Sequence, residues 1–212
     1  MNPPIALDDW QPLWRQTWTL LGTDASVPEL SAVLAAWSEP QRHYHDLRHL
    51  RECLRRWTAW QHLAEHPGEV ALALWYHDVV YQPRSGDNEL HSATWAVRAM
   101  AEAHLDSQAA ERVHALIMAT CHDAPATTPD QRLLIDIDLA VLGASPERFA
   151  AYDDDVRQEY GWVPSELYRQ KRREVLERFL QRPRLYETDA AFDELEAQAR
   201  HNLAAALSRL GA

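Results

Sequence analysis

Apolar residues recur at helical spacing along most of the chain, and short stretches rich in proline, glycine or polar residues separate these segments. No run of alternating β-branched residues is long enough to predict a strand. Two capping boxes, Ser26-Val27-Pro28-Glu29 and Thr128-Pro129-Asp130-Gln131, mark helix starts. The pattern predicts an all-α fold, a single helical domain over residues 1–212, with helices near 8–21, 26–37, 45–65, 69–80, 88–104, 107–121, 128–143, 145–160, 165–181 and 189–210.

Segment 69–80 (EVALALWYHDVV) is apolar on almost every side. A helix of this kind is normally buried at the centre of a bundle. His77 and Asp78 lie side by side at its end. Because an unpaired buried charge is costly, these two side chains need partners. The segment therefore predicts a polar site close to the core.

The composition is that of a globular protein, with 46% apolar and 25% charged residues. The net charge of −11 argues against a protein that binds duplex nucleic acid, which needs a basic face. We find neither an apolar run of about 18 residues nor a secretory signal at the start, so we expect no membrane partner and a cytoplasmic location. The cysteines, Cys53 and Cys121, suggest neither a metal-type cluster nor a disulfide framework. The oligomeric state stays open.

Histidine and aspartate side chains concentrate at three places on predicted helices. These are the pair His45 and His49, the pair His77 and Asp78, and the pair Asp136 and Asp138 inside the apolar run 133–142. The first pair is four residues apart, so both side chains share one helix face. A mixed set of nitrogen and oxygen donors suits a divalent ion such as Mn, Fe, Co, Ni or Zn, with Mg as a further candidate.

Five motifs carry a resemblance to a known family. They are YHDLRH at 44–49, HDVVY at 77–81, NELHSA at 88–93, TCH at 120–122 and DIDLAVLG at 136–143. Their histidines and aspartates resemble the HD superfamily of metal-dependent phosphohydrolases, whose pattern is H…HD…D on an all-α core. Within it, the order of all five motifs looks most like that of a group of bacterial proteins of about 200 residues. The resemblance implies a bundle of the HD-domain or phosphodiesterase-like type. Its metal-site core covers about residues 40–180, and N- and C-terminal helices pack on this core.

The resemblance also assigns the metal ligands by position. A second metal ion would use His122, with Asp78 as the bridge between the ions, and the number of ions stays open. Asp136 is the rival of Asp138 for the last ligand. The ligands that the resemblance implies are His49, His77, Asp78, Asp138 and, for a second ion, His122.

The YHxxxH element is also similar to that of cyclic-nucleotide phosphodiesterases, in which the first histidine protonates the leaving oxygen. By that resemblance His45 is the general acid. Asp78 of the HD pair is counted with the catalytic residues as a metal ligand, and Glu89 of the NELHSA motif is the candidate that orients the attacking water or reaches a metal. The implied reaction is the attack of metal-bound hydroxide on the phosphorus of a small phosphorylated metabolite, with a nucleotide as the preferred class. The candidates that would bind the phosphate are Arg42, Arg48, Arg157, Lys171 and Arg172.

Other functions stay open at this point. One alternative is a regulatory HD module that binds a nucleotide with little turnover, and another is a bundle that a metal only stabilises. A third is an alarmone hydrolase, although its usual acidic pair after HD is replaced here by Val79-Val80. We expect His91 to be a solvated helix residue.

Overall fold

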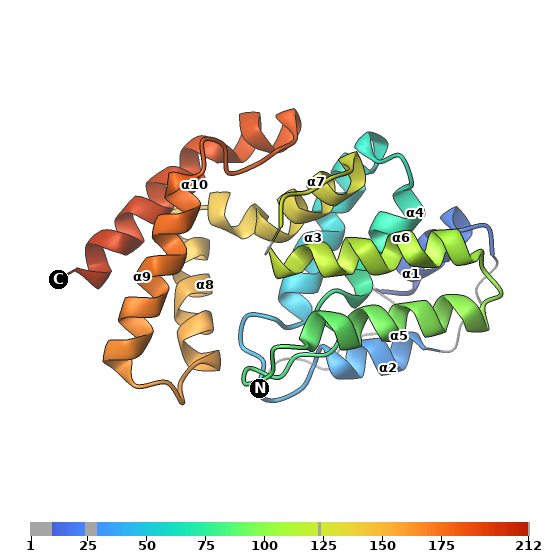
Figure 1. Ribbon diagram of the computed structural model, residues 1–212, viewed down its shortest axis with the longest axis horizontal. Helices are drawn as coiled ribbons and strands as arrows, with labels where there is room; N and C mark the ends of the chain where they lie inside the picture. The colour runs from blue at the N-terminus through green and yellow to red at the C-terminus, as the bar shows by residue number, and fades with distance from the viewer. Residues whose placement is uncertain (1–9, 24–28, 123, 212) are drawn as a thin grey trace. The chain divides into compact units, whose positions relative to one another are not determined.

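The structure is a computed structural model that describes residues 10–23, 29–122 and 124–211 (Figure 1). Within these ranges regular structure is helical and no strand occurs, so the all-α prediction is confirmed. The helices are α1 Gln11–Leu20, α2 Leu30–Ala36, α3 Leu47–Trp60, α4 Pro67–Tyr76, α5 Asn88–Glu102, α6 Ser107–Met118, α7 Pro129–Asp138, α8 Pro146–Glu159, α9 Ser165–Gln181 and α10 Asp189–Leu210, with 3₁₀ turns η2 Gln61–Leu63, η3 Ala119–Cys121 and η4 Leu139–Gly143.

One of the two predicted capping boxes is complete in the structure. The Thr128 hydroxyl accepts a hydrogen bond from the Gln131 backbone at 3.2 Å, and the Gln131 side chain accepts one from the Thr128 backbone at 3.3 Å. Each side chain thus satisfies a backbone donor that the first turn of α7 leaves unpaired. Residues 26–28 of the other box lie outside the described residues, and α2 begins at Leu30.

The central apolar helix ends earlier than its sequence predicts. The pattern extends it to residue 80, but α4 ends at Tyr76 and His77 is its C-cap residue. Two side chains of α5 explain the early end. Ser92 Oγ accepts a hydrogen bond from the Val80 backbone at 3.1 Å, and Asn88 Oδ1 accepts one from the Gln82 backbone at 3.0 Å. These side chains replace the acceptors that another helical turn would supply.

The chain divides into two compact units. The first unit consists of Met1–Glu39 and His45–Leu134, and the second of Pro40–Tyr44 and Ile135–Ala212. The boundary at residue 134 falls inside α7. The prediction of one domain over residues 1–212 stays a prediction, and each unit is described by itself below.

In the first unit, α4 forms the core. Every residue from Gly68 to Tyr76 is buried, which confirms that this segment is central. Helices α1, α3, α5 and α6 pack on it, and α5 and α6 also pack along each other (Figure 1). Much of the filling is aromatic, because seven of the nine tryptophans of the chain are buried. The Trp75 ring lies 5.1 Å from that of Trp14, and its Nε1 donates to Thr17 at 3.0 Å.

In the second unit, α8, α9, α10 and η4 pack together. The glycine that closes the DIDLAVLG motif has a steric reason, since a Cβ at Gly143 would lie 2.6 Å from the Cβ of Leu195 on α10. Asn202 fixes the same turn, because its amide donates to the carbonyls of Leu142 at 2.8 Å and Ala144 at 2.9 Å. The motif therefore ends in glycine because η4 and α10 approach each other too closely for a larger side chain.

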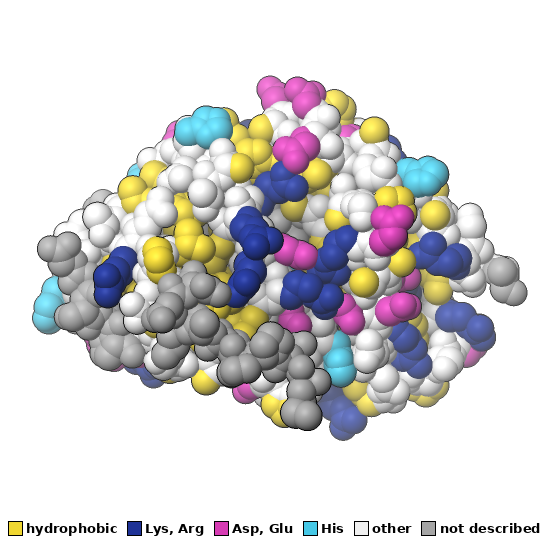
Figure 2. Space-filling view, turned by 180° about the vertical axis from the view of Figure 1, so that it is seen from behind, with side chains coloured by type: hydrophobic (Ala, Val, Ile, Leu, Met, Phe, Trp, Pro, Cys, Tyr) yellow, Lys and Arg dark blue, Asp and Glu magenta, His cyan; other side chains and the backbone are white. Residues whose placement is uncertain are grey.

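No helix in the described ranges is long and apolar enough to cross a membrane. Figure 2 shows one face of the molecule, on which basic, acidic and hydrophobic side chains are interspersed.

Candidate metal centre

Helix α3 places His49 and Cys53 at successive turns, and His45 lies just before its N-cap residue. Asp46 is the N-cap residue, and its carboxylate accepts hydrogen bonds from the backbones of Arg48 at 2.8 Å and His49 at 3.3 Å. The helix therefore starts at Leu47, directly after His45 and Asp46 of the motif. Burial raises the pKa of the Asp46 carboxyl, while these hydrogen bonds act in the opposite direction. His49 and Cys53 point into the core, with 1% and 2% of their surfaces exposed.

The HD pair lies directly after the last residue of α4. His77 Nδ1 is 2.9 Å from the carbonyl oxygen of Leu74, and only 1% of the residue is exposed. A carbonyl can only accept, so Nδ1 carries the proton of this hydrogen bond. In a neutral ring Nε2 then holds the lone pair, which is the tautomer that binds a metal.

Three side chains of the first unit converge on this lone pair. His49 Nε2 lies 3.2 Å from His77 Nε2, and Asp78 Oδ2 lies 3.2 Å from His77 Nε2 and 3.9 Å from His49 Nε2. Cys53 Sγ lies 3.7 Å from His49 Nδ1. The donor atoms of His49, Cys53 and His77 are all within 4.8 Å of one another. This buried cluster of histidine, cysteine and aspartate side chains could hold a metal ion.

The polar atoms of the cluster could share a cation. With Nδ1 of a neutral His77 donating to Leu74, Nε2 and the Asp78 carboxylate oxygen are two acceptors 3.2 Å apart. A metal ion could bind both atoms. The aromatic ring of Trp37 closes one side, at 5.3 Å from the His77 ring and 6.1 Å from the His49 ring. An apolar neighbour makes an unbalanced charge more costly there.

The NELHSA motif positions the chain that follows the HD pair. Ser92 binds both the amide and the carbonyl of Val80, at 3.1 and 3.4 Å, and Asn88 does the same for Gln82, at 3.0 and 3.1 Å. Tyr81 lies between these anchored residues. Its ring stacks on the His45 imidazole with centroids 4.3 Å apart. The motif thus fixes a neighbour of the predicted general acid.

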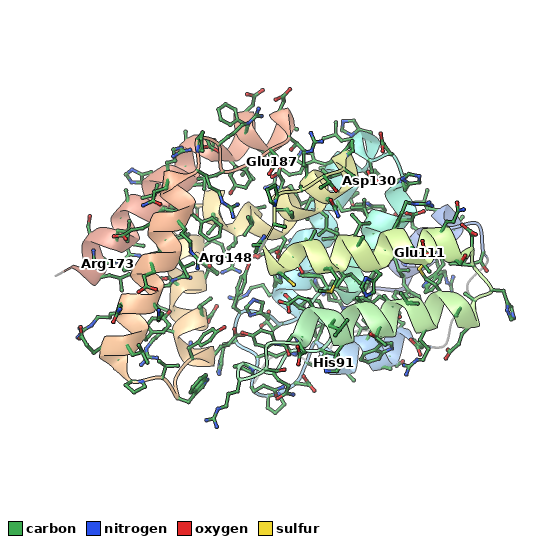
Figure 3. The ribbon with its side chains drawn as sticks, in the orientation of Figure 1. His91, Glu111, Asp130, Arg148, Arg173 and Glu187 are labelled. Carbon is green, nitrogen blue, oxygen red and sulfur yellow. The ribbon has the colours of Figure 1, made fainter. Side chains whose placement is uncertain are left out.

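The two aspartates of DIDLAVLG differ in their surroundings. Asp136 is fully buried, and its carboxylate accepts hydrogen bonds from the backbones of Glu187 at 2.9 Å and Thr188 at 2.7 Å and from the Thr188 hydroxyl at 2.6 Å. Asp136 therefore fixes the backbone of the residues just before α10, of which Glu187 is labelled in Figure 3. Burial raises its pKa, and the same hydrogen bonds oppose that shift. Asp138, half-buried at the end of α7, belongs to the second unit, and its role as the last ligand stays a prediction.

Three of the predicted phosphate ligands have partners inside the second unit. Arg157 donates to the carbonyl of Tyr160 at 2.7 Å and lies over the Tyr168 ring. Arg172 is buried against Asp153, with Nε to Oδ1 at 2.9 Å, and Lys171 pairs with Glu174 at 2.8 Å on the surface. These contacts are those of residues that stabilise the unit, and their role in substrate binding stays a prediction.

The remaining predicted site residues are distributed over both units. Arg42 is buried in the second unit, whereas Arg48 is exposed on α3 in the first. Glu89 is half-buried in the first turn of α5. His122 caps η3 in a left-handed conformation with φ of 55°. None of these placements tests the predicted roles.

His91 is exposed on α5, as expected for a solvated residue (Figure 3).

Cys53 was not among the predicted site residues. The statement that the cysteines form no metal-type cluster is wrong for Cys53, which lies beside His49 and His77. A signal was present in the sequence, since Cys53 follows His49 by four residues and so shares its helix face. Buried cysteine is more often a small apolar core residue, and the spacing alone did not outweigh that interpretation.

A second group of acidic and histidine side chains has a structural explanation. Asp130, labelled in Figure 3, lies in the first turn of α7 near Glu65 and His66. Its oxygens accept hydrogen bonds from the Glu65 backbone at 2.7 Å, the His66 backbone at 3.0 Å and His66 Nδ1 at 3.0 Å. The carboxylate therefore binds the backbone that leads into α4.

Comparisons of the chain with models of protein families, with curated proteins and with solved structures each found no match.

Proposed function

We propose that the chain is a metal-dependent phosphohydrolase of the HD type that releases phosphate from a small phosphorylated metabolite, with a nucleotide as the preferred substrate class. The order of motifs in the sequence supports the reaction class. The cluster in the first unit supports the metal. A site gives the type of reaction more firmly than the substrate, so the phosphate group is the part of the substrate that this proposal specifies.

One observation carries the proposal. His77 Nε2, with its lone pair set by the hydrogen bond to Leu74, lies 3.2 Å both from His49 Nε2 and from Asp78 Oδ2. Two imidazole nitrogens and a carboxylate oxygen at these distances form a donor set for a divalent ion. The two histidines are buried and Asp78 is half-buried, so the surrounding helices hold all three donors close together.

In the proposed site His49, His77 and Asp78 of the first unit would hold the ion. The resemblance adds Asp138 as the last ligand and His122 for a second ion. A bound divalent ion would lower the pKa of a water molecule and polarise a phosphoryl oxygen. Asp136 is not proposed as a ligand, because its carboxylate already accepts three hydrogen bonds from Glu187 and Thr188.

His45 is the proposed donor of a proton to the leaving oxygen. Its ring lies 5.9 Å from the His49 ring and stacks on Tyr81, so it is held near the cluster without belonging to the ligand set. A positioned general acid contributes about 10²–10⁴-fold to a rate. Arg42 and Arg48 are the proposed phosphate contacts, because they flank this histidine segment in the sequence. Glu89 is the proposed water-orienting residue.

The test combines metal content with turnover. Metal analysis of the purified protein should find a divalent transition ion, and the variants His49→Ala and His77→Ala should lose it. The matched control is His91→Ala, which removes an exposed histidine of α5 and should retain the ion. The same four proteins are then assayed on a generic phosphate monoester with added manganese, where the wild type and His91→Ala should release phosphate.

The outcomes separate the candidate functions. A wild type that stays free of metal after incubation with manganese, iron, nickel and zinc would contradict the proposal at its first step. Metal binding with nucleotide-dependent stabilisation but no phosphate release would instead indicate a regulatory module.

A further inference from the structure

Cys53 places a sulfur atom against the histidine pair. It lies four residues after His49 on α3, and only 2% of its surface is exposed. Its Sγ is 3.7 Å from Nδ1 and 3.8 Å from Nε2 of His49. A spacing of four residues on one helix face is the spacing at which paired helical ligands reach a shared zinc ion. The pattern H…HD…D does not include this residue.

The distances can be compared with those of a tetrahedral site. Bond lengths of about 2.0–2.1 Å from zinc to nitrogen and about 2.3 Å to sulfur give a separation of about 3.3 Å between two nitrogens and about 3.6 Å between nitrogen and sulfur. In the structure the two Nε2 atoms are 3.2 Å apart, and Sγ is 3.8 Å from Nε2 of His49. Both separations are close to those that one bound ion would impose, and the donor atoms of His49, Cys53 and His77 all lie within 4.8 Å of one another.

We propose that Cys53 is a further ligand of the metal centre, with its Sγ bound to the same ion as His49 and His77. This inference rests on the proposed metal site. Sulfur is a soft donor that favours zinc, cobalt or iron over magnesium and manganese, so Cys53 sets the metal preference. Sulfur binds metal as thiolate, and the thiol proton leaves to solvent when the ion enters.

The alternative is that Cys53 is only a small core residue. A buried thiol packs like an apolar side chain and donates weakly to a neighbouring imidazole. In that case the sulfur is near the ion but not bonded to it. The two cases differ in spectroscopy, because only a bonded thiolate gives charge transfer to an open-shell metal.

Cobalt(II) is the probe. The metal-free protein is titrated with cobalt and its near-ultraviolet absorption is recorded together with metal content after gel filtration. The wild type should show a thiolate-to-cobalt charge-transfer band. The variant Cys53→Ser should lose the band, whereas Cys121→Ser, which changes the other cysteine of the chain, should keep it. Circular dichroism confirms that each variant is folded.

A second measurement does not depend on any variant. X-ray absorption of the zinc-loaded wild type should show one sulfur at about 2.3 Å from the metal.

Cys53→Ser should also weaken zinc binding by at least about tenfold relative to manganese, because even residues outside a ligand set change metal affinity by about 10–100-fold.

The results distinguish the two proposals. Stoichiometric cobalt or zinc without a sulfur signal overturns the role of Cys53 and leaves the metal centre intact. No retained metal at all overturns both. A charge-transfer band that survives in Cys53→Ser and disappears in Cys121→Ser would also overturn the assignment of Cys53.

Discussion

The His45 imidazole and the Tyr81 phenol ring stack with centroids 4.3 Å apart and planes inclined by 27°. The stack joins the start of α3 to the segment after α4. Neither residue belongs to the buried donor set, but His45 lies edge-on to His49 at 5.9 Å. Because Tyr81 follows an anchored backbone, the orientation of His45 depends on α5.

Removing that anchor should affect turnover more than metal binding. Ser92→Ala deletes the hydroxyl that binds the Val80 amide and carbonyl, and it leaves a half-buried amide without that acceptor. We expect the free energy of unfolding to fall by about 1–2 kcal/mol, and we expect slower phosphate release at unchanged cobalt stoichiometry. Thr94→Ala is the matched control, since its hydroxyl caps only a carbonyl of its own helix, that of Leu90, at 2.7 Å. Equal rates in the two variants would contradict a positioning role for Ser92.

Substitution of the two aspartates at the end of α7 should have different effects on stability and on metal content. Asp136→Ala leaves the amides of Glu187 and Thr188 without their acceptor, so it should lower the free energy of unfolding by at least about 2 kcal/mol. Asp138→Ala should lower metal content with a smaller change in stability. Chemical denaturation and metal analysis of both variants are the measurements. Loss of metal from Asp136→Ala alone, at unchanged stability, would exchange the two assignments.

Asp130 should stabilise the entry to α4 rather than bind an ion. Asp130→Ala removes the acceptor of three hydrogen bonds from Glu65 and His66 and should cost about 1–3 kcal/mol in urea denaturation. Asp106→Ala is the comparison, because that carboxylate caps α6 with one bond of 3.2 Å to Ala109 at the surface, and it should cost less. Metal content should stay at the wild-type value in both variants. A loss of metal in Asp130→Ala would show that this group is a site.

Tyr168 should make the protein less stable at alkaline pH. Burial raises the pKa of its phenol from 10.0 to about 12, because the ionised form is poorly solvated there. The folded state thus holds the proton more tightly than the unfolded state. Its stabilising contribution is complete below the unfolded pKa and is lost as the pH rises through the folded one.

The variant Tyr168→Phe tests whether the phenol of Tyr168 causes this loss of stability at alkaline pH. Urea denaturation at about pH 9 and about pH 11 should show a smaller loss of stability in the variant than in the wild type. An identical loss in both proteins would show that other groups account for the alkaline limit.

The sequence predicted local features better than those that depend on distant partners. The burial of α4 follows from its continuous apolar run, and the capping box at Thr128 uses residues only three apart. The early end of α4 could not be predicted, because the competing acceptors are the side chains of Asn88 and Ser92 on the next helix. A helical pattern carries no information about such partners.

In the candidate site too, features set by nearby residues were easier to predict than those that depend on distant partners. The His49 and His77 contact was predicted from motif order and resemblance, and it is present within the first unit. The role of Asp136 was not predicted, because its donors lie 51 and 52 residues further along the chain. The spacing of four residues between His49 and Cys53 is evident in the sequence. The proposed role of Cys53 also depends on His77, which lies at the end of α4.

Helix α7 has a consequence for the order in which backbone amides become protected from exchange with solvent. Its Asp130 carboxylate binds the amides of Glu65 and His66, and its Asp136 carboxylate binds those of Glu187 and Thr188. These four amides precede the first turns of α4 and α10, so neither turn has internal acceptors for them. Their protection therefore depends on α7 being folded. In native-state hydrogen exchange they should open together with α7, as members of its cooperative unit rather than as frayed ends of the helices they precede.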